Sequence, residues 1–152
     1  MHHPRHTIVY ADDDPDAVFF VQRAFKALSA SHHLEIAQDG EQAITRIREK
    51  LPHMVLLDLK MPFFNGIEVV AWMRCQPAPV SGIPAVLFSS SALQSDILLA
   101  RSTGANGYIV KPAKLDDLRD VLQALSRSFL SDQPVPDWHE FHGHGMSGMG
   151  AA

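Results

Sequence analysis

Short apolar runs alternate with segments of helical periodicity over the first 130 residues, and this alternation constrains the fold more than any other feature. Segment 115–129 has the most regular helical stripe of apolar side chains. Buried parallel strands joined by covering helices produce this pattern. We therefore predict an α/β fold with five β-α units, a doubly wound five-stranded parallel sheet with helices on both faces. The strand-like runs are Thr7–Ala11, Leu34–Ala37, Met54–Leu57, Ala85–Phe88 and Gly107–Val110.

Helix boundaries are marked by residues that cap helices or end them. Asp14-Pro15, Asp39-Gly40 and Asn65-Gly66 each place a side-chain acceptor where a helix begins. Gly104 follows the fourth helical segment and predicts its end. In the third helix we expect the packed side to consist of Ile67, Val70 and Ala71, with Trp72 and Met73 lying off it.

Composition narrows the class of protein. The 152 residues fit one domain, without room for a second catalytic or DNA-binding domain. The 13 basic and 17 acidic residues give a net charge of −4, which disfavours binding to nucleic acid or an anionic membrane. Cys75 is the only cysteine, and no apolar run approaches the length of a membrane span or signal peptide. We expect a soluble, cytoplasmic protein.

The chain ends differ from its middle. We assign 1–6 to an N-terminal extension, 7–130 to the domain, and 131–152 to a flexible C-terminal tail. The tail holds two prolines and four of the nine glycines, a composition that favours disorder. Its histidines leave metal binding open, although a polar tail that happens to contain histidines is the favoured interpretation. These histidines are His139, His142 and His144.

Acidic, hydroxyl and basic residues follow the predicted strands where functional groups gather in open parallel sheets. The first strand runs into 12–14, three aspartates, and the third into Asp58. The fourth runs into three serines, 89–91, and the fifth into Lys111. Crowded carboxylates repel one another unless a proton or cation intervenes, and Mg²⁺ suits such a site. A lysine and a hydroxyl opposite supply what a phosphoryl group needs, so the set predicts a phosphoryl acceptor with its metal.

Four segments in order resemble the receiver domains of two-component response regulators over about residues 5–130. They are VYADDDPDAVFFVQRAF, VLLDLKMPFFNGIEVVAWMR, IPAVLFSSSA and GANGYIVKPAKLDDL. The resemblance implies a CheY-like sheet with strand order 2-1-3-4-5. It also implies a phospho-accepting Asp58, a phosphate-pairing Lys111, and a switch formed by Ser89 and Tyr108. The Mg²⁺ ligands it implies are Asp12, Asp13, Asp58 and the backbone carbonyl of Lys60.

The same resemblance implies a partner and an output. The chain is similar to stand-alone regulators that accept phosphate from hybrid or phytochrome-type histidine kinases and are not turnover enzymes. Output would pass through the surface of the fourth helix, fifth strand and fifth helix, by homodimerisation or partner docking. Residues Ile97, Leu98 and Leu99 are consecutive in the fourth helix, so they point 100° apart. We therefore expect at least one of them to be exposed.

The residues after the first and third strands disfavour two other functions and leave a third open. A haloacid-dehalogenase-type phosphatase needs a second aspartate two residues after the nucleophile, where this chain has Lys60. A flavodoxin-like flavin binder needs a phosphate-binding loop after the first strand, where Asp12, Asp13 and Asp14 would repel phosphate. The serious alternative is a receiver-like adaptor that signals without phosphorylation.

Overall fold

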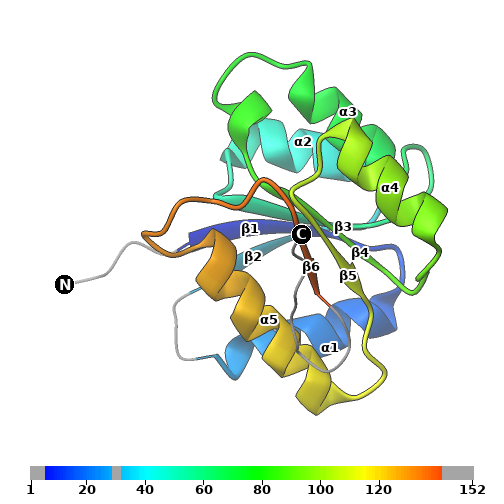
Figure 1. The fold of residues 1–152 in the computed structure, drawn as a ribbon, viewed down its shortest axis with the longest axis vertical. Helices are drawn as coiled ribbons and strands as arrows, with labels where there is room; N and C mark the ends of the chain where they lie inside the picture. The colour runs from blue at the N-terminus through cyan, green and yellow to red at the C-terminus, as the bar shows by residue number, and fades with distance from the viewer. Residues whose placement is uncertain (1–5, 29–31, 142–152) are drawn as a thin grey trace.

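One parallel β-sheet forms the centre of the computed structural model, which describes residues 6–28 and 32–141 (Figure 1). Six strands lie in the order β2-β1-β3-β4-β5-β6. This confirms the predicted α/β architecture and the order 2-1-3-4-5, while β6 departs from the prediction of five strands. The bounds are His6–Ala11 (β1), His32–Ala37 (β2), Met54–Asp58 (β3), Ala85–Ser89 (β4), Gly107–Val110 (β5) and His139–Phe141 (β6).

Helices cover both faces of the sheet. In Figure 1, α1 and α5 lie below the sheet, and α2, α3 and α4 lie above it. A short 3₁₀ helix, Val80–Gly82 (η1), lies between α3 and β4. None of the helices within the described residues has both the length and the apolar character that crossing a membrane requires. The helices are Pro15–Lys26 (α1), Gly40–Lys50 (α2), Gly66–Arg74 (α3), Gln94–Thr103 (α4) and Leu115–Phe129 (α5).

The helix ends follow the expected capping chemistry. The Asp14 side chain accepts a hydrogen bond from the backbone N–H of Asp16, which caps α1. Asn65 and Glu68 form a capping box at the start of α3. Gly104 ends α4 with a φ of 115°, a conformation that favours glycine. The sequence signals for these boundaries are therefore confirmed.

Two apolar layers enclose the sheet, one on each face. Between the sheet and α1 and α5 lie large side chains such as Phe25, Leu122 and Phe129. Between the sheet and α2, α3 and α4 lie side chains such as Ile47, Met73 and Ile97. β3 and β4 are buried along their whole length. This explains their uninterrupted apolar sequences, because both faces of a central parallel strand contact helices.

The prediction of which side of α3 is packed against the domain is wrong. The buried positions are Gly66, Val69, Val70 and Met73, whereas Ala71 is exposed. Only Val70 is common to the expected and observed buried sets, and Ile67 is half-buried. The helix has nine residues, most of them apolar, so its periodicity cannot distinguish two neighbouring stripes.

The prediction of a flexible tail is wrong for the part of the tail that the structure describes. β6 pairs with β5, and Phe141 is buried beside Phe129, their ring centroids 6.4 Å apart. Asn106 connects the tail to the rest of the domain. Its side-chain amide donates to the carbonyl of Pro136, and its backbone carbonyl accepts from the backbone N–H of His139. Buried aromatic area and paired backbone groups therefore offset the ordering cost that the composition suggests. His142 and His144 lie outside the described residues.

The anchoring of β6 can be tested by truncating its buried aromatic side chain. Replacing Phe141 with Ala should lower the free energy of unfolding by about 3 kcal/mol, because a fully packed ring is lost and a cavity remains. Urea unfolding followed by circular dichroism measures this change. Val135→Ala, at a position 42% exposed, is the matched control and should change stability little. Equal effects of the two substitutions would contradict the packing of β6.

Candidate functional site

Two carboxylates meet at the carboxyl edge of the sheet because of the strand register. β1 and β3 are parallel neighbours with Ala11 opposite Leu57, so the next residues, Asp12 and Asp58, leave the sheet side by side. Carboxylate oxygens of Asp12, Asp13 and Asp58 all lie within 4.8 Å of one another. Asp12 and Asp58 are buried, whereas Asp13 is exposed. The structure thus brings together the three predicted acidic ligands.

Lys111 supplies the cation facing this cluster. Its Nζ lies 3.0 Å from Oδ2 of Asp12 and 3.5 Å from Oδ1 of Asp58. Its backbone N–H donates to the carbonyl of Ser89, which fixes the start of the loop after β5 against the end of β4. The ammonium group also lies 5.2 Å from the centre of the Phe88 ring. One lysine therefore contacts carboxylates from two different strands.

Burial and crowding alter the protonation of the cluster. Burial of Asp58, and then the negative charge of Asp12, raise the pKa of Asp58 to about 7, although Lys111 opposes the rise. The Tyr10 hydroxyl donates to Oδ2 of Asp12 at 2.7 Å, and burial followed by that carboxylate raises the pKa of Tyr10. The sequence argument missed Tyr10, whose only signal was its place two residues before Asp12 on β1.

The donor set fits a hard divalent cation. The cluster has three carboxylates and one lysine, which contacts two of them, so its acidic groups outnumber its basic ones. Carboxylate oxygens are the ligands that Mg²⁺ prefers, and the exposed Asp13 leaves a side open to water. This is the only group of three or more candidate ligands found within the described part of the chain, and His139 is not in it.

A tightly constrained loop connects Asp58 to α3. Gly66 donates its backbone N–H to the carbonyl of Leu59 at 2.9 Å. A Cβ at Gly66 would lie 2.3 Å from the carbonyl oxygen of Asp58, so any side chain there would displace the backbone of Asp58. Lys60 lies in this loop with its side chain exposed, and the role of its carbonyl as a ligand stays a prediction.

The two predicted switch residues are buried and share a contact. The Ser89 hydroxyl accepts from the backbone N–H of Ser91 at 3.0 Å, and the Tyr108 hydroxyl donates to the carbonyl of Ser91 at 2.9 Å. The Ser91 hydroxyl in turn donates to Asp96 in the first turn of α4, at 2.6 Å. The sequence did not predict that Ser91 connects Ser89, Tyr108 and α4.

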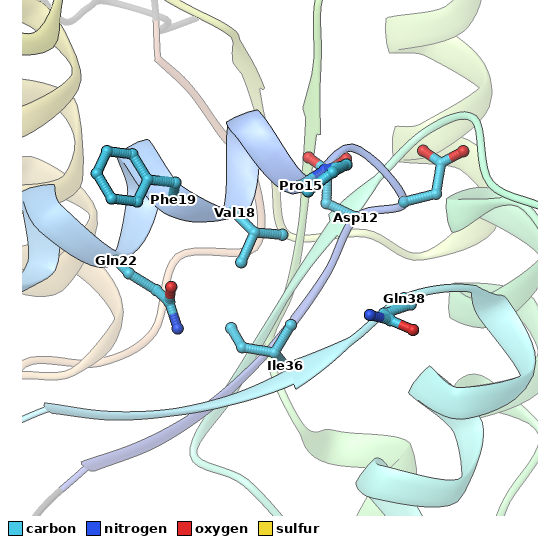
Figure 2. A pocket seen from close by; sticks show the side chains of 8 residues that line it. Asp12, Pro15, Val18, Phe19, Gln22, Ile36 and Gln38 are labelled. Carbon is cyan, nitrogen blue, oxygen red and sulfur yellow. The ribbon is translucent and has the colours of Figure 1, made fainter.

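An open pocket of about 510 Å³ adjoins the carboxylates. Figure 2 shows Pro15, Val18 and Phe19 of α1 on one side and Ile36 of β2 on the other, with Asp12 beside Pro15. Gln22 and Gln38 also line the pocket, which therefore combines apolar, amide and acidic groups. Such a surface suits an apolar side chain of a molecule that also reaches the carboxylates.

Comparison with known proteins identifies the family. The model of the response regulator receiver domain matches residues 8–123 of the chain. The chain belongs to the response regulator receiver family. Its site combines the acidic cluster with a lysine and a serine at the ends of neighbouring strands, as the resemblance of the sequence implies.

The curated relatives include several DNA-binding regulators. The chain is 33% identical over 114 residues to the DNA-binding response regulator MtrA of Mycolicibacterium smegmatis, covering 75% of this chain and 47% of MtrA. It is 36% identical over 121 residues to the positive alginate biosynthesis regulatory protein of Pseudomonas aeruginosa, covering 79% and 47%. It is 29% identical over 129 residues to the probable methanogenesis regulatory protein FilR2 of Methanothrix harundinacea, covering 81% and 83%. The chain thus spans about half the length of the first two.

Solved response regulators have a similar fold over nearly their full length. The Mn²⁺-bound form of Rcp1 gives a TM-score of 0.74 at 27% identity and covers 86% of this chain and 99% of that one. The phosphorylated cyanobacterial phytochrome response regulator RcpA gives a TM-score of 0.78 at 26% identity, and the match covers 88% of this chain and 99% of RcpA. RPA3017, from red-light signalling of R. palustris, gives a TM-score of 0.76 at 29% identity, and the match covers 86% of this chain and 98% of RPA3017.

The charge crowding predicts a pH-dependent gain in stability when Asp58 is neutralised. In EDTA at about pH 8, Asp58→Asn should raise the free energy of unfolding by about 2 kcal/mol. Burial and the charge of Asp12 make the ionised form of Asp58 less stable in the folded protein than in the unfolded chain, which is why its pKa is raised. This loss of stability is absent below the ordinary pKa of 3.8 and complete above about pH 7. The advantage of the variant should therefore disappear as the pH falls toward 4, as measured by urea unfolding.

Asp13→Asn is the matched control for this experiment. Asp13 is exposed and makes the smallest contribution to the raised pKa of Asp58, so its neutralisation should give a smaller gain. A gain for Asp58→Asn that does not vary between pH 4 and 8 would contradict the electrostatic explanation.

Proposed function

We propose that the chain is a phospho-accepting receiver that takes a phosphoryl group from the phosphohistidine of a histidine kinase onto Asp58. The single observation that supports this most is the contact of Lys111 with both Asp12 and Asp58 at the sheet edge. A lysine in this place pairs with the oxygens of a phosphoryl group held on Asp58. A receiver-like adaptor that never accepts phosphate has no need of this arrangement.

The transfer uses the Asp58 carboxylate as the nucleophile. One carboxylate oxygen forms a bond to phosphorus as the phosphorus–nitrogen bond of the donor breaks, and the imidazole leaves. We assign Mg²⁺ to Asp12, Asp13, Asp58 and the carbonyl of Lys60. When bound, the ion neutralises charge on the phosphoryl oxygens. The chain catalyses only its own modification and its later hydrolysis, so we do not class it as a turnover enzyme.

The proposed partner is a histidine kinase of the phytochrome or hybrid type, with the regulator acting as a stand-alone cytoplasmic protein. Similarity to RcpA and RPA3017, a phytochrome regulator and a red-light signalling regulator, supports this partner class. The match covers 99% and 98% of those chains. The pocket beside Asp12 and the exposed Phe19 offers an apolar surface next to the acceptor.

Labelling with a small phosphodonor tests the acceptor. Acetyl phosphate with Mg²⁺ should add one phosphoryl group to the chain, detected as a mass increase in the intact protein, and EDTA should prevent it. Asp58→Asn should abolish the modification because the nucleophile is lost. Asp39→Asn, which keeps a side-chain oxygen at the cap of α2, is the control and should be labelled like the wild type. Undiminished labelling of Asp58→Asn would refute the acceptor, and unlabelled wild type would favour the adaptor.

The proposed output surface lies on α4. Leu98 and Leu99 are 57% and 53% exposed, and Leu93 before the helix is 65% exposed, so the expected exposed leucine is confirmed. β5 is not an edge strand, because β6 pairs with it. The surface of α4, β5 and α5 that the sequence predicts for a homodimer or partner therefore presents α4 and β6 instead of a free β5 edge.

Activation should strengthen association through these leucines. Sedimentation velocity with and without beryllofluoride, which mimics a phosphoryl group on Asp58, should show a larger species in the activated sample. Leu98→Asp and Leu99→Asp should remove the increase, because a charge in an apolar contact is costly. Leu51→Asp, at an exposed residue that ends α2, away from α4, β5 and α5, is the control. Identical sedimentation in both states, unaffected by either leucine substitution, would place the output elsewhere.

A further inference from the structure

An exposed phenylalanine in the loop between Asp58 and α3 adopts a backbone conformation that its residue type disfavours. Phe63 is 74% exposed and has a φ of 71°. A positive φ is uncommon for residues other than glycine, asparagine and aspartate, and a bulky side chain makes it more so. Neither burial of the ring nor backbone preference therefore accounts for phenylalanine at this position.

The loop around Phe63 is held firmly on both sides. The Phe64 N–H donates to the carbonyl of Pro62 at 2.9 Å, and the Gly40 N–H at the start of α2 donates to the same carbonyl at 3.3 Å. A Cβ at Gly40 would lie 2.0 Å from the carbonyl oxygen of Phe64, so α2 and the loop are in close contact. These contacts thus fix the position of the backbone that carries the exposed ring of Phe63.

Phe63 lies in the loop that directly follows the proposed acceptor. A Cβ at Gly66 would lie 2.3 Å from the carbonyl oxygen of Asp58, and Phe63 is three residues before Gly66, so the Cα atoms of Phe63 and Gly66 are at most about 11 Å apart. Asp58 is only 8% exposed, so a protein-bound phosphohistidine must approach it over the surrounding loops. The loop that carries Phe63 is one of them.

We propose that Phe63 is a contact residue for the phosphodonor protein and helps to determine which donor can phosphorylate Asp58. This inference rests on the proposed function, because it names a residue of the chain that recognises the donor. The donor supplies an apolar patch beside its phosphohistidine, and the ring of Phe63 packs on that patch. The disfavoured backbone conformation is retained because it directs the ring outward from the loop that follows Asp58, where burial of an aromatic side chain adds most to binding.

The experiment compares a protein donor with a small donor that lacks the apolar patch of a protein. The full chain and its variants are phosphorylated by acetyl phosphate, and separately by the phosphorylated histidine kinases of the source organism. The kinase that labels the wild type fastest is used for kinetics. Phe63→Gly and Phe63→Asn remove the ring with residues that tolerate a positive φ better than phenylalanine does, and Phe63→Tyr keeps an aromatic ring.

Leu51 provides a matched control. It is the other residue of the described chain with a positive φ that is not glycine, at 46°, and its side chain is 49% exposed. It ends α2 at the opposite end from Gly40, which the helical rise places about 16 Å away. Leu51→Gly also relieves a positive φ, outside the loop that carries Phe63.

We expect kcat/KM for the kinase to fall about tenfold in Phe63→Gly and Phe63→Asn, the loss of one apolar contact of a binding surface. Labelling by acetyl phosphate should stay within about twofold of the wild type, because the chemistry is unchanged. Phe63→Tyr and Leu51→Gly should match the wild type with both donors. The unfolding midpoints of Phe63→Gly and Leu51→Gly should be equal to or above that of the wild type.

Several results would overturn the inference. Kinase labelling of Phe63→Gly at the wild-type rate would show that the ring does not contact the donor. An equal loss with acetyl phosphate would show that Phe63 acts by positioning the site. If acetyl phosphate labels Asp58 and no kinase labels the wild type, donor recognition is overturned and the acceptor stands. If neither donor labels Asp58, the proposed function itself fails.

Discussion

Repulsion among carboxylates at one edge of the sheet is the constraint on which the site depends. Asp12 and Asp58 are buried side by side. The strands fix their separation, because Asp12 directly follows β1 and Asp58 is the last residue of β3. Lys111 contacts both, and Tyr10 donates to Asp12 from within β1. These contacts offset only part of the cost of burying the charges, since the pKa of Asp58 remains raised to about 7. The edge is thus built to favour a cation or a proton, at the expense of stability in their absence.

The rest of the fold can be understood as the support for this edge. The α-helices on both faces make β3 and β4 fully buried, so the strands that carry Asp58 and Ser89 have little freedom to move. The close approach of Gly66 to the carbonyl of Asp58 fixes the loop that follows. Rigid strands and a constrained loop hold the carboxylates near one another despite their repulsion, which is what a preorganised phosphoryl acceptor requires.

The sequence was sufficient to predict those parts of the molecule that repeat or that lie at strand ends. Five strands, their helices and the convergence of Asp12, Asp13, Asp58 and Lys111 follow from apolar periodicity and from the geometry of parallel sheets. β6 did not follow, because three residues among prolines and glycines carry no periodic signal, and Phe141 is the one of the three that is buried. The roles of Tyr10 and of Ser91 as a connecting residue also escaped prediction, because they come from hydrogen bonds that only the folded chain brings together.

The contacts of Ser91 explain how a change of charge on Asp58 can reach α4. The Ser89 hydroxyl accepts from the N–H of Ser91, so its own proton remains available for a phosphoryl oxygen on Asp58. A movement of Ser89 toward that oxygen then draws Ser91 with it instead of separating the two. Because the carbonyl of Ser91 holds the Tyr108 hydroxyl and its side chain holds Asp96, the same movement acts on a buried aromatic ring and on the first turn of α4. Coupling of this kind needs no long chain of contacts. Ser89, Ser91 and Asp96 are joined by hydrogen bonds, and they lead from the site to the helix that bears the exposed leucines.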